Sequence, residues 1–188
     1  MKRAWKILLP MPAVVLLISG CGYNRIQALD EQVNQAKGQI GVQLQRRADL
    51  IPNLVETVKG YAKQESTVFT QVADARARLS GAVAGGQVGE MADANVALTG
   101  ALGRLLAIAE AYPELKSDQN FRALQDQLEG TENRIAVART DYNEAVGQLN
   151  AYIRTFPYNL TAMIFRQSTP RPYFEASPGA AEAPRVEF

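Results

Sequence analysis

The chain has 188 residues, about the length of one domain, and 47% of them are apolar while 21% are charged. This composition can build a hydrophobic core and excludes a disordered chain. The sequence contains no histidine and one cysteine. These absences exclude Ser-His-Asp triads, Cys-His dyads and zinc sites. We therefore expect no metal, no cofactor and no enzymatic activity.

The N-terminus has the three-part plan of a secretory signal peptide. A basic start precedes a nearly continuous apolar run over 7–18, which is too short to span a bilayer of about 30 Å. The residues Ile18-Ser19-Gly20-Cys21 resemble a bacterial lipobox. We predict a signal peptide over 1–20 and a Cys21 that carries acyl chains such as palmitate. An ordinary cleaved signal peptide and a short uncleaved anchor are the alternatives.

This N-terminus predicts a protein anchored to a membrane by lipid, facing the periplasm or the cell exterior. Residues 1–20 hold three of the 20 basic residues, so their removal leaves 17 basic against 19 acidic side chains. No basic field remains to attract nucleic acid, which is not expected as a partner. Gly22 stands where an aspartate marks inner-membrane retention in some enteric bacteria, and this favours the outer membrane.

Heptad spacing of apolar residues dominates the rest of the chain and predicts an all-α fold. The clearest series has Phe121, Leu128, Ile135, Tyr142, Leu149 and Phe156. Similar spacing predicts four long helices over 23–48, 51–79, 91–112 and 118–156. Residues 21–165 are thus expected to form an up-and-down bundle of four helices.

Turn and cap residues support these boundaries. Asp49 is a candidate cap with Pro52 in a first turn, although Pro52 could instead lie within one long helix. Ser117 is a candidate N-cap for the last helix, and Pro157 would stop it. Five of the nine prolines lie within 157–188, which predicts an extended or flexible Pro-rich tail over 166–188.

Four stretches resemble the LemA family. They are RRADLIPNLVETVKGYA at 46–62, EAYPELK at 110–116, TENRI at 131–135 and APRVEF at 183–188. The resemblance implies a bacterial membrane-anchored helical bundle and no known activity. It also implies a protein partner, either a TPM-domain protein or a membrane metallopeptidase. Many members of the family carry a transmembrane helix where this chain has a lipobox, and Gln64 replaces a frequent histidine.

The densest cluster of charge is the candidate partner-binding site, with Arg46, Arg47, Asp49 and Asn53. Guanidinium groups bind carboxylates with two hydrogen bonds, which suits a docking surface. Alternatively, the arginines favour a helix dipole at a helix end and Asp49 caps the next helix.

Other charged residues are expected to be structural. Glu65 falls on the apolar seam of its helix and would need a partner, for which Arg104, Arg134 and Arg139 are candidates. The acids Asp126, Glu129 and Glu132 share one face, which is more typical of a solvated stripe than of a cation site.

The sequence favours a non-enzymatic, membrane-anchored scaffold or adaptor. A self-assembling structural protein of the envelope is the alternative, because heptad bundles with small seam residues can form homo-oligomers. A third alternative is an enzyme that uses carboxylates alone.

Overall fold

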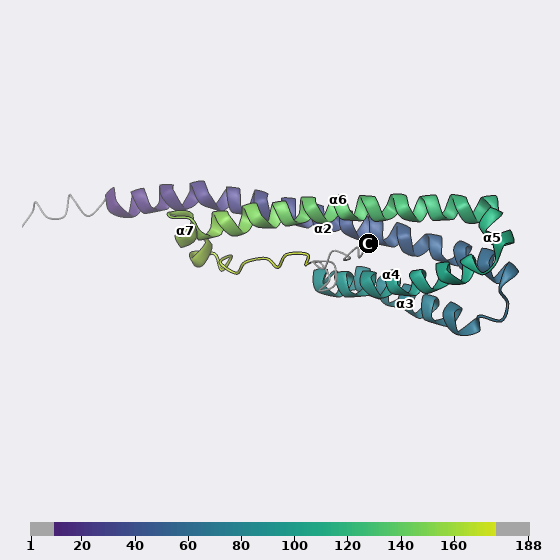
Figure 1. Cartoon of the computed structure of the whole chain (residues 1–188). Helices are drawn as coiled ribbons and strands as arrows, with labels where there is room; N and C mark the ends of the chain where they lie inside the picture. The colour runs from purple at the N-terminus through teal and green to yellow at the C-terminus, as the bar shows by residue number, and fades with distance from the viewer. Residues whose placement is uncertain (1–9, 176–188) are drawn as a thin grey trace, which may run out of the picture. The chain divides into compact units, whose positions relative to one another are not determined.

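The computed structural model describes the backbone of residues 10–175 and the side chains of residues 22–175. This part of the chain forms six α-helices and no strand, which confirms the all-α class (Figure 1). The helices are α2 (Pro10–Tyr61), α3 (Ser66–Gly85), α4 (Val88–Glu110), α5 (Pro113–Ser117), α6 (Gln119–Arg154) and α7 (Tyr158–Ile164). The predicted count of four helices is corrected to six. The predicted signal peptide lies outside the described side chains.

The chain divides into two compact units. Among the described residues, the first unit combines the part of α2 up to Ala36 with Asp141–Tyr173, and the second combines Lys37–Thr140 with Phe174 and Glu175. Helices α2 and α6 therefore contribute residues to both units.

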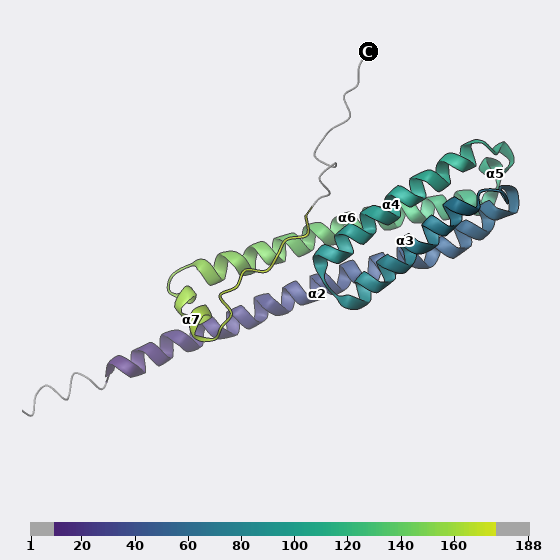
Figure 2. The same cartoon turned by 90° about the horizontal axis from the view of Figure 1, so that it is seen from below.

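The first unit packs the early part of α2 beside the late part of α6 and α7 (Figures 1 and 2). Its buried apolar side chains follow the predicted heptads, with Ile26, Leu29 and Val33 from α2 and Tyr142, Val146, Leu149 and Ile153 from α6. Helix α7 folds back after the cis peptide bond Phe156–Pro157, and the rings of Tyr152 and Tyr158 stack with centroids 4.3 Å apart.

The second unit is centred on the hairpin of α3 and α4, which pack along one another (Figure 2). Gly86 makes the turn possible because its φ of 69° lies in the left-handed region, where its N–H bonds the carbonyls of Ala82 and Val83. Side chains from α2, α3, α4 and α6 fill the core of this unit, including Leu44, Leu54, Leu79, Leu98, Leu105 and Ile135.

Pro52 lies inside α2 and does not end it. Proline lacks the N–H that would bond the carbonyl four residues earlier, which here belongs to Ala48. Arg76 on α3 supplies the missing donor, with its Nε 2.9 Å from the Ala48 oxygen. The expected break near Pro52 is therefore absent, and Asp49 caps no helix there because it lies within α2.

The predicted helix over 51–79 is wrong because a turn separates α2 from α3 at 62–65. The heptad series runs Ile51, Val58, Glu65 and Val72, so its one polar member falls at this turn. Glu65 is half-buried at the N-cap position of α3 and makes no capping hydrogen bond with its side chain. In the described structure Glu65 forms no ion pair with any of the three arginines proposed for it. One of them, Arg139, lies instead against the Phe174 ring at 4.6 Å.

The N-cap of α6 is Asp118 rather than the predicted Ser117. The Asp118 Oδ1 accepts hydrogen bonds from the N–H groups of Asn120 at 2.8 Å and Phe121 at 3.0 Å. Ser117 instead donates to the carbonyl of Glu114 at 2.9 Å. Ser117 is the last residue of α5, so Asp118 is the residue that precedes the first residue of α6 and occupies its N-cap position. Helix α6 ends at Arg154, close to Pro157 as expected.

Candidate functional site

A groove of about 650 Å³ lies on the second unit, where α2 meets the α3–α4 hairpin. It is lined by Lys37, Gly38, Gly41, Val42, Gln45, Arg46, Asp49, Leu50, Val83, Gly86 and Met91. The residues from α2 recur at intervals of three and four, so they share one face of the helix. We call this feature the α2 groove.

The α2 groove is lined by apolar side chains and by three charged ones, Lys37, Arg46 and Asp49, which we call its rim. Val42 is 59% exposed despite its apolar side chain. No side chain fills the space above Gly38, since a Cβ built there would meet nothing within 4 Å. Asp49 accepts a hydrogen bond from Gln45 at 2.8 Å. In the described part of the chain, Lys37 and Arg46 have no ion pair.

The structure separates the four predicted partner-binding residues. Arg46 and Asp49 line the α2 groove. Asn53 is exposed one turn further along α2, outside the residues that line the groove, and its carbonyl accepts a hydrogen bond from Thr57 at 2.8 Å. Arg47 points away from the solvent, with 7% of its side chain exposed.

Arg47 joins three helices inside the second unit. Its Nη1 donates to the Asn95 Oδ1 on α4 at 2.7 Å and forms an ion pair with Glu132 on α6. Burial lowers the pKa of Arg47, and the charge of Glu132 opposes that effect. The Arg47 Nε is buried without a hydrogen-bond partner in the described structure. These contacts give Arg47 a structural role in the second unit.

This internal ion pair was missed because Arg47 and Glu132 were assigned to separate surface clusters. The signal lay in the spacing, since Ile40, Arg47 and Leu54 occur every seven residues and place the arginine on an apolar seam. A charged residue on such a seam needs a partner on a facing helix.

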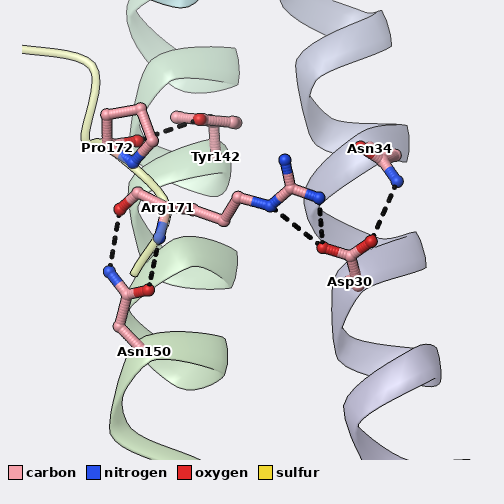
Figure 3. A network of polar contacts seen from close by, with 6 residues as sticks. All are labelled: Asp30, Asn34, Tyr142, Asn150, Arg171 and Pro172. Carbon is pink, nitrogen blue, oxygen red and sulfur yellow. Dashed lines mark hydrogen bonds and ion pairs between the residues drawn. The ribbon is translucent and has the colours of Figure 1, made fainter. Parts of the chain in front are cut away.

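A second polar cluster lies in the first unit, where the segment after α7 runs beside α6 and the Arg171 side chain reaches toward Asp30 on α2 (Figure 3). Arg171 donates through Nε and Nη2 to the Asp30 Oδ1, at 3.1 and 2.8 Å. Asn150 receives the Arg171 N–H at 2.8 Å and donates to the Arg171 carbonyl at 2.9 Å. The Tyr142 hydroxyl donates to the Pro172 carbonyl at 2.9 Å, and burial raises the pKa of Tyr142.

This cluster, which we call the 171 clasp, borders a cavity of about 310 Å³ that Arg166, Gln167 and Thr169 also line. The main-chain N–H and C=O of Arg171 are both bonded to the buried side chain of Asn150. These bonds hold the described start of the predicted tail in place. The 171 clasp therefore holds the segment after α7 against α2 and α6 within the first unit.

Residues 22–175 contain no group of three or more His, Cys, Asp or Glu side chains that could hold a metal ion. Helix α4 alone among the described helices is long and apolar enough to cross a membrane, and nine of its residues are buried in the second unit. The Cys21 side chain lies outside the described residues.

These features define an all-helical protein. A sequence profile described as the LemA family matches residues 36–188. The chain belongs to the LemA family, as its sequence motifs indicated.

Curated relatives are magnetosome proteins. Magnetosome proteins MamQ 1 and MamQ 2 of Paramagnetospirillum magneticum are each 29% identical over 189 residues, which covers 87% of this chain and 68% of the relative. Magnetosome protein MamQ of Magnetospirillum gryphiswaldense is 29% identical over 165 residues, which covers 76% of this chain and 61% of the relative. Neither the family description nor these names give an enzymatic activity.

Proposed function

We propose that this protein is a membrane-anchored adaptor that binds a helix of a partner protein in the α2 groove. The observation that carries the proposal is the exposed apolar face of α2 at Val42, next to the unpaired Arg46. The protein acts by holding its partner and not by catalysis.

The shape of the groove favours a helix as its occupant. Gly38 leaves open space beside α2, while Gly41, one turn along, already faces the Val83 side chain of the hairpin at 3.8 Å, so a second backbone can approach closely at Gly38. Val42, Leu50 and Val83 line the groove and are exposed or half-buried, so they offer apolar contacts to a partner. A partner helix with apolar residues at intervals of three and four would bury these side chains.

The charge of the rim specifies a carboxylate on the partner. Lys37 and Arg46 are two cations of the groove without an ion pair in the described structure, while Asp49 is already bonded to Gln45. A glutamate or aspartate on the partner helix would pair with Arg46 through two hydrogen bonds. A helix of a TPM-domain protein or a membrane metallopeptidase is the partner class that the family resemblance implies.

The anchoring part of the proposal rests on the N-terminus. We propose that residues 1–20 are removed and that Cys21 carries the lipid, on the periplasmic or outer side of the envelope. Two or more acyl chains make such an anchor stable. Mass spectrometry of the mature protein tests this step, because a mature chain that begins at any residue other than an acylated Cys21 would contradict it.

Site-specific photocrosslinking in cells tests the adaptor role. A photoreactive residue replaces Val42 in the groove, or Val137 on α6 as the matched control, since both valines are about 60% exposed in the second unit (59% and 61%). We expect a crosslinked partner at position 42 and none at position 137. Adding Arg46→Glu should remove the adduct, and an acid-to-arginine change in the captured helix should restore it.

The same experiment separates the alternative function. A self-assembling envelope protein would give an adduct of twice the mass of the chain, with both halves carrying its own peptides. Such an adduct at position 42 would show that the groove binds a second copy of the chain, and it would contradict the adaptor role. An adduct that survives Arg46→Glu without change would show that the charge of Arg46 does not contribute to binding of the partner.

A further inference from the structure

The first unit exposes several large apolar side chains close together in and around α7. Phe156, Leu160, Met163, Ile164 and Phe165 are between 47% and 74% exposed. They lie within ten consecutive residues, and two of them flank the short helix while the others belong to it. An exposed apolar patch of this kind marks a site of contact with another protein, a ligand or a membrane.

This patch lies directly beside the residue that follows Cys21. A Cβ built on Gly22 would come within 2.9 Å of the Tyr158 ring and 3.3 Å of the Thr161 Oγ1. One residue further, the rings of Tyr23 and Phe165 have centroids 4.5 Å apart. Helix α7 is thus packed against the point where the apolar N-terminal run joins the folded unit.

The charge at this end of the unit has one sign. No acidic residue occurs from Ala145 to Phe174 or before Asp30. Arg25, Arg154 and Arg166 are exposed here and have no ion pair in the described structure. Arg171, the remaining arginine of this stretch, is held by Asp30.

We propose that α7 and its flanking residues form a lipid-binding surface that enters the interface of a bilayer rich in anionic phospholipid. The apolar side chains would lie at the boundary of headgroups and acyl chains, and the arginines would contact phosphates. This inference rests on the membrane association of the proposed function and adds a second contact with the same bilayer. The contact would fix the first unit close to the membrane.

Depth-dependent fluorescence quenching tests this surface in the lipid-anchored mature chain. Trp5 is the only tryptophan and lies within the residues proposed to be removed, and Trp5→Phe keeps any uncleaved chain dark as well. A new tryptophan replaces Ile164 in the patch, 64% exposed, or Val137 on α6, 61% exposed. Each protein is reconstituted with vesicles of phosphatidylcholine and phosphatidylglycerol that contain brominated acyl chains. We expect at least twofold quenching for Ile164→Trp and none for Val137→Trp.

The charge contribution has its own variant. Arg25→Glu with Arg154→Glu should halve the quenching of Ile164→Trp on anionic vesicles and leave it unchanged on pure phosphatidylcholine. If quenching falls equally on both kinds of vesicle, the arginines do not recognise anionic phospholipid, and that part of the proposal is refuted. The circular dichroism of the variant, compared with that of its parent, shows that its helices are intact.

Flotation of the same samples distinguishes the possible failures. If the chain floats with the vesicles and position 164 is quenched no more than position 137, the membrane association stands and the lipid-binding surface is refuted. A chain that does not float refutes both. A blue-shifted Ile164→Trp emission that rises with protein concentration, without bromine quenching, shows that a second copy covers the patch and overturns the inference.

Discussion

The guanidinium of Arg76 donates a hydrogen bond to the carbonyl oxygen of Ala48, 2.9 Å away. This is the carbonyl that Pro52, four residues later, leaves without its helical donor. A side chain of α3 thus takes over a main-chain bond of α2. The contact explains how a 52-residue helix continues through a proline.

The first prediction is a coupling between Arg76 and Pro52. Arg76→Met keeps the apolar stem and removes the donor, so we expect a loss of about 1–3 kcal/mol in the free energy of unfolding. In a Pro52→Ala chain, the N–H of residue 52 can bond Ala48, and the same change should cost about 1 kcal/mol less. Urea denaturation of the four chains of this cycle measures the coupling.

The exposed Arg78 provides the control for this cycle. Arg78→Met lies on the same helix and should change the free energy of unfolding by less than about 0.5 kcal/mol in either background. An equal loss from Arg76→Met with and without Pro52 would show that the arginine does not replace the missing donor.

The second prediction concerns the internal ion pair of the second unit. Glu132→Ala leaves the Arg47 guanidinium buried with Asn95 as its one bonded partner in the described structure. We expect the free energy of unfolding to fall by about 2 kcal/mol or more, because a buried cation without its counter-charge is costly. Glu129→Ala, on an exposed position of the same helix, should cost less than about 0.5 kcal/mol in the same denaturation experiment.

The third prediction concerns the 171 clasp. Asn150→Ala removes both hydrogen bonds to the main chain of Arg171. We expect the Arg171 amide to exchange its hydrogen about tenfold faster or more, which corresponds to about 1.4 kcal/mol of lost protection. Hydrogen exchange followed by mass spectrometry measures this. Gln148→Ala, two residues away and exposed, should leave the exchange unchanged; equal exchange in both variants would contradict the clasp.

Heptad spacing predicted most of the helical structure and most of the buried side chains. Ile26, Leu29, Val33, Ile40 and Leu44 are all buried as their spacing indicated, because a long amphipathic helix has few other ways to hide an apolar stripe. The break at 62–65 was not predicted, because Asp49 and Pro52 had the pattern of a cap and first turn of a new helix, and the alternative of one long helix through Pro52 is the one that the structure has. Only the partner Arg76, distant in sequence, reverses that expectation.

The candidate site was partly predictable for a similar reason. Arg46 and Asp49 stood out as charges in a dense cluster, and both line the α2 groove. The groove itself could not be predicted, since it needs Val83 and Met91 from the hairpin to complete it. The exposure of α7 could not be predicted either. Residues up to 165 were expected to form part of the bundle, whereas the structure buries only Thr161 and Ala162 of this helix.

The last prediction is a pH dependence at the start of α6. The N–H of Phe121 donates to the Asp118 carboxylate and lowers the pKa of Asp118, with smaller help from Tyr61, Asn120 and Arg122. A carboxyl whose pKa is lower in the folded state stabilises the fold above its unfolded pKa, about 3.9. That stability is lost as the pH falls from there through the folded pKa. The melting temperature of the wild type should therefore fall on acidification in this range.

Asp118→Asn separates this titration from the remaining acids. Asparagine can still accept the N–H bonds of the cap but does not ionise, so its melting temperature should fall less than that of the wild type below about pH 4. Tyr61→Phe removes the hydroxyl that donates to Asp118 at 3.1 Å and should keep the cap and most of the acid response. At alkaline pH the sign reverses for Tyr61, because the carboxylate raises the pKa of its hydroxyl and the bond is lost on ionisation. Identical acid profiles for the wild type and Asp118→Asn would show that the carboxylate charge adds nothing to this cap.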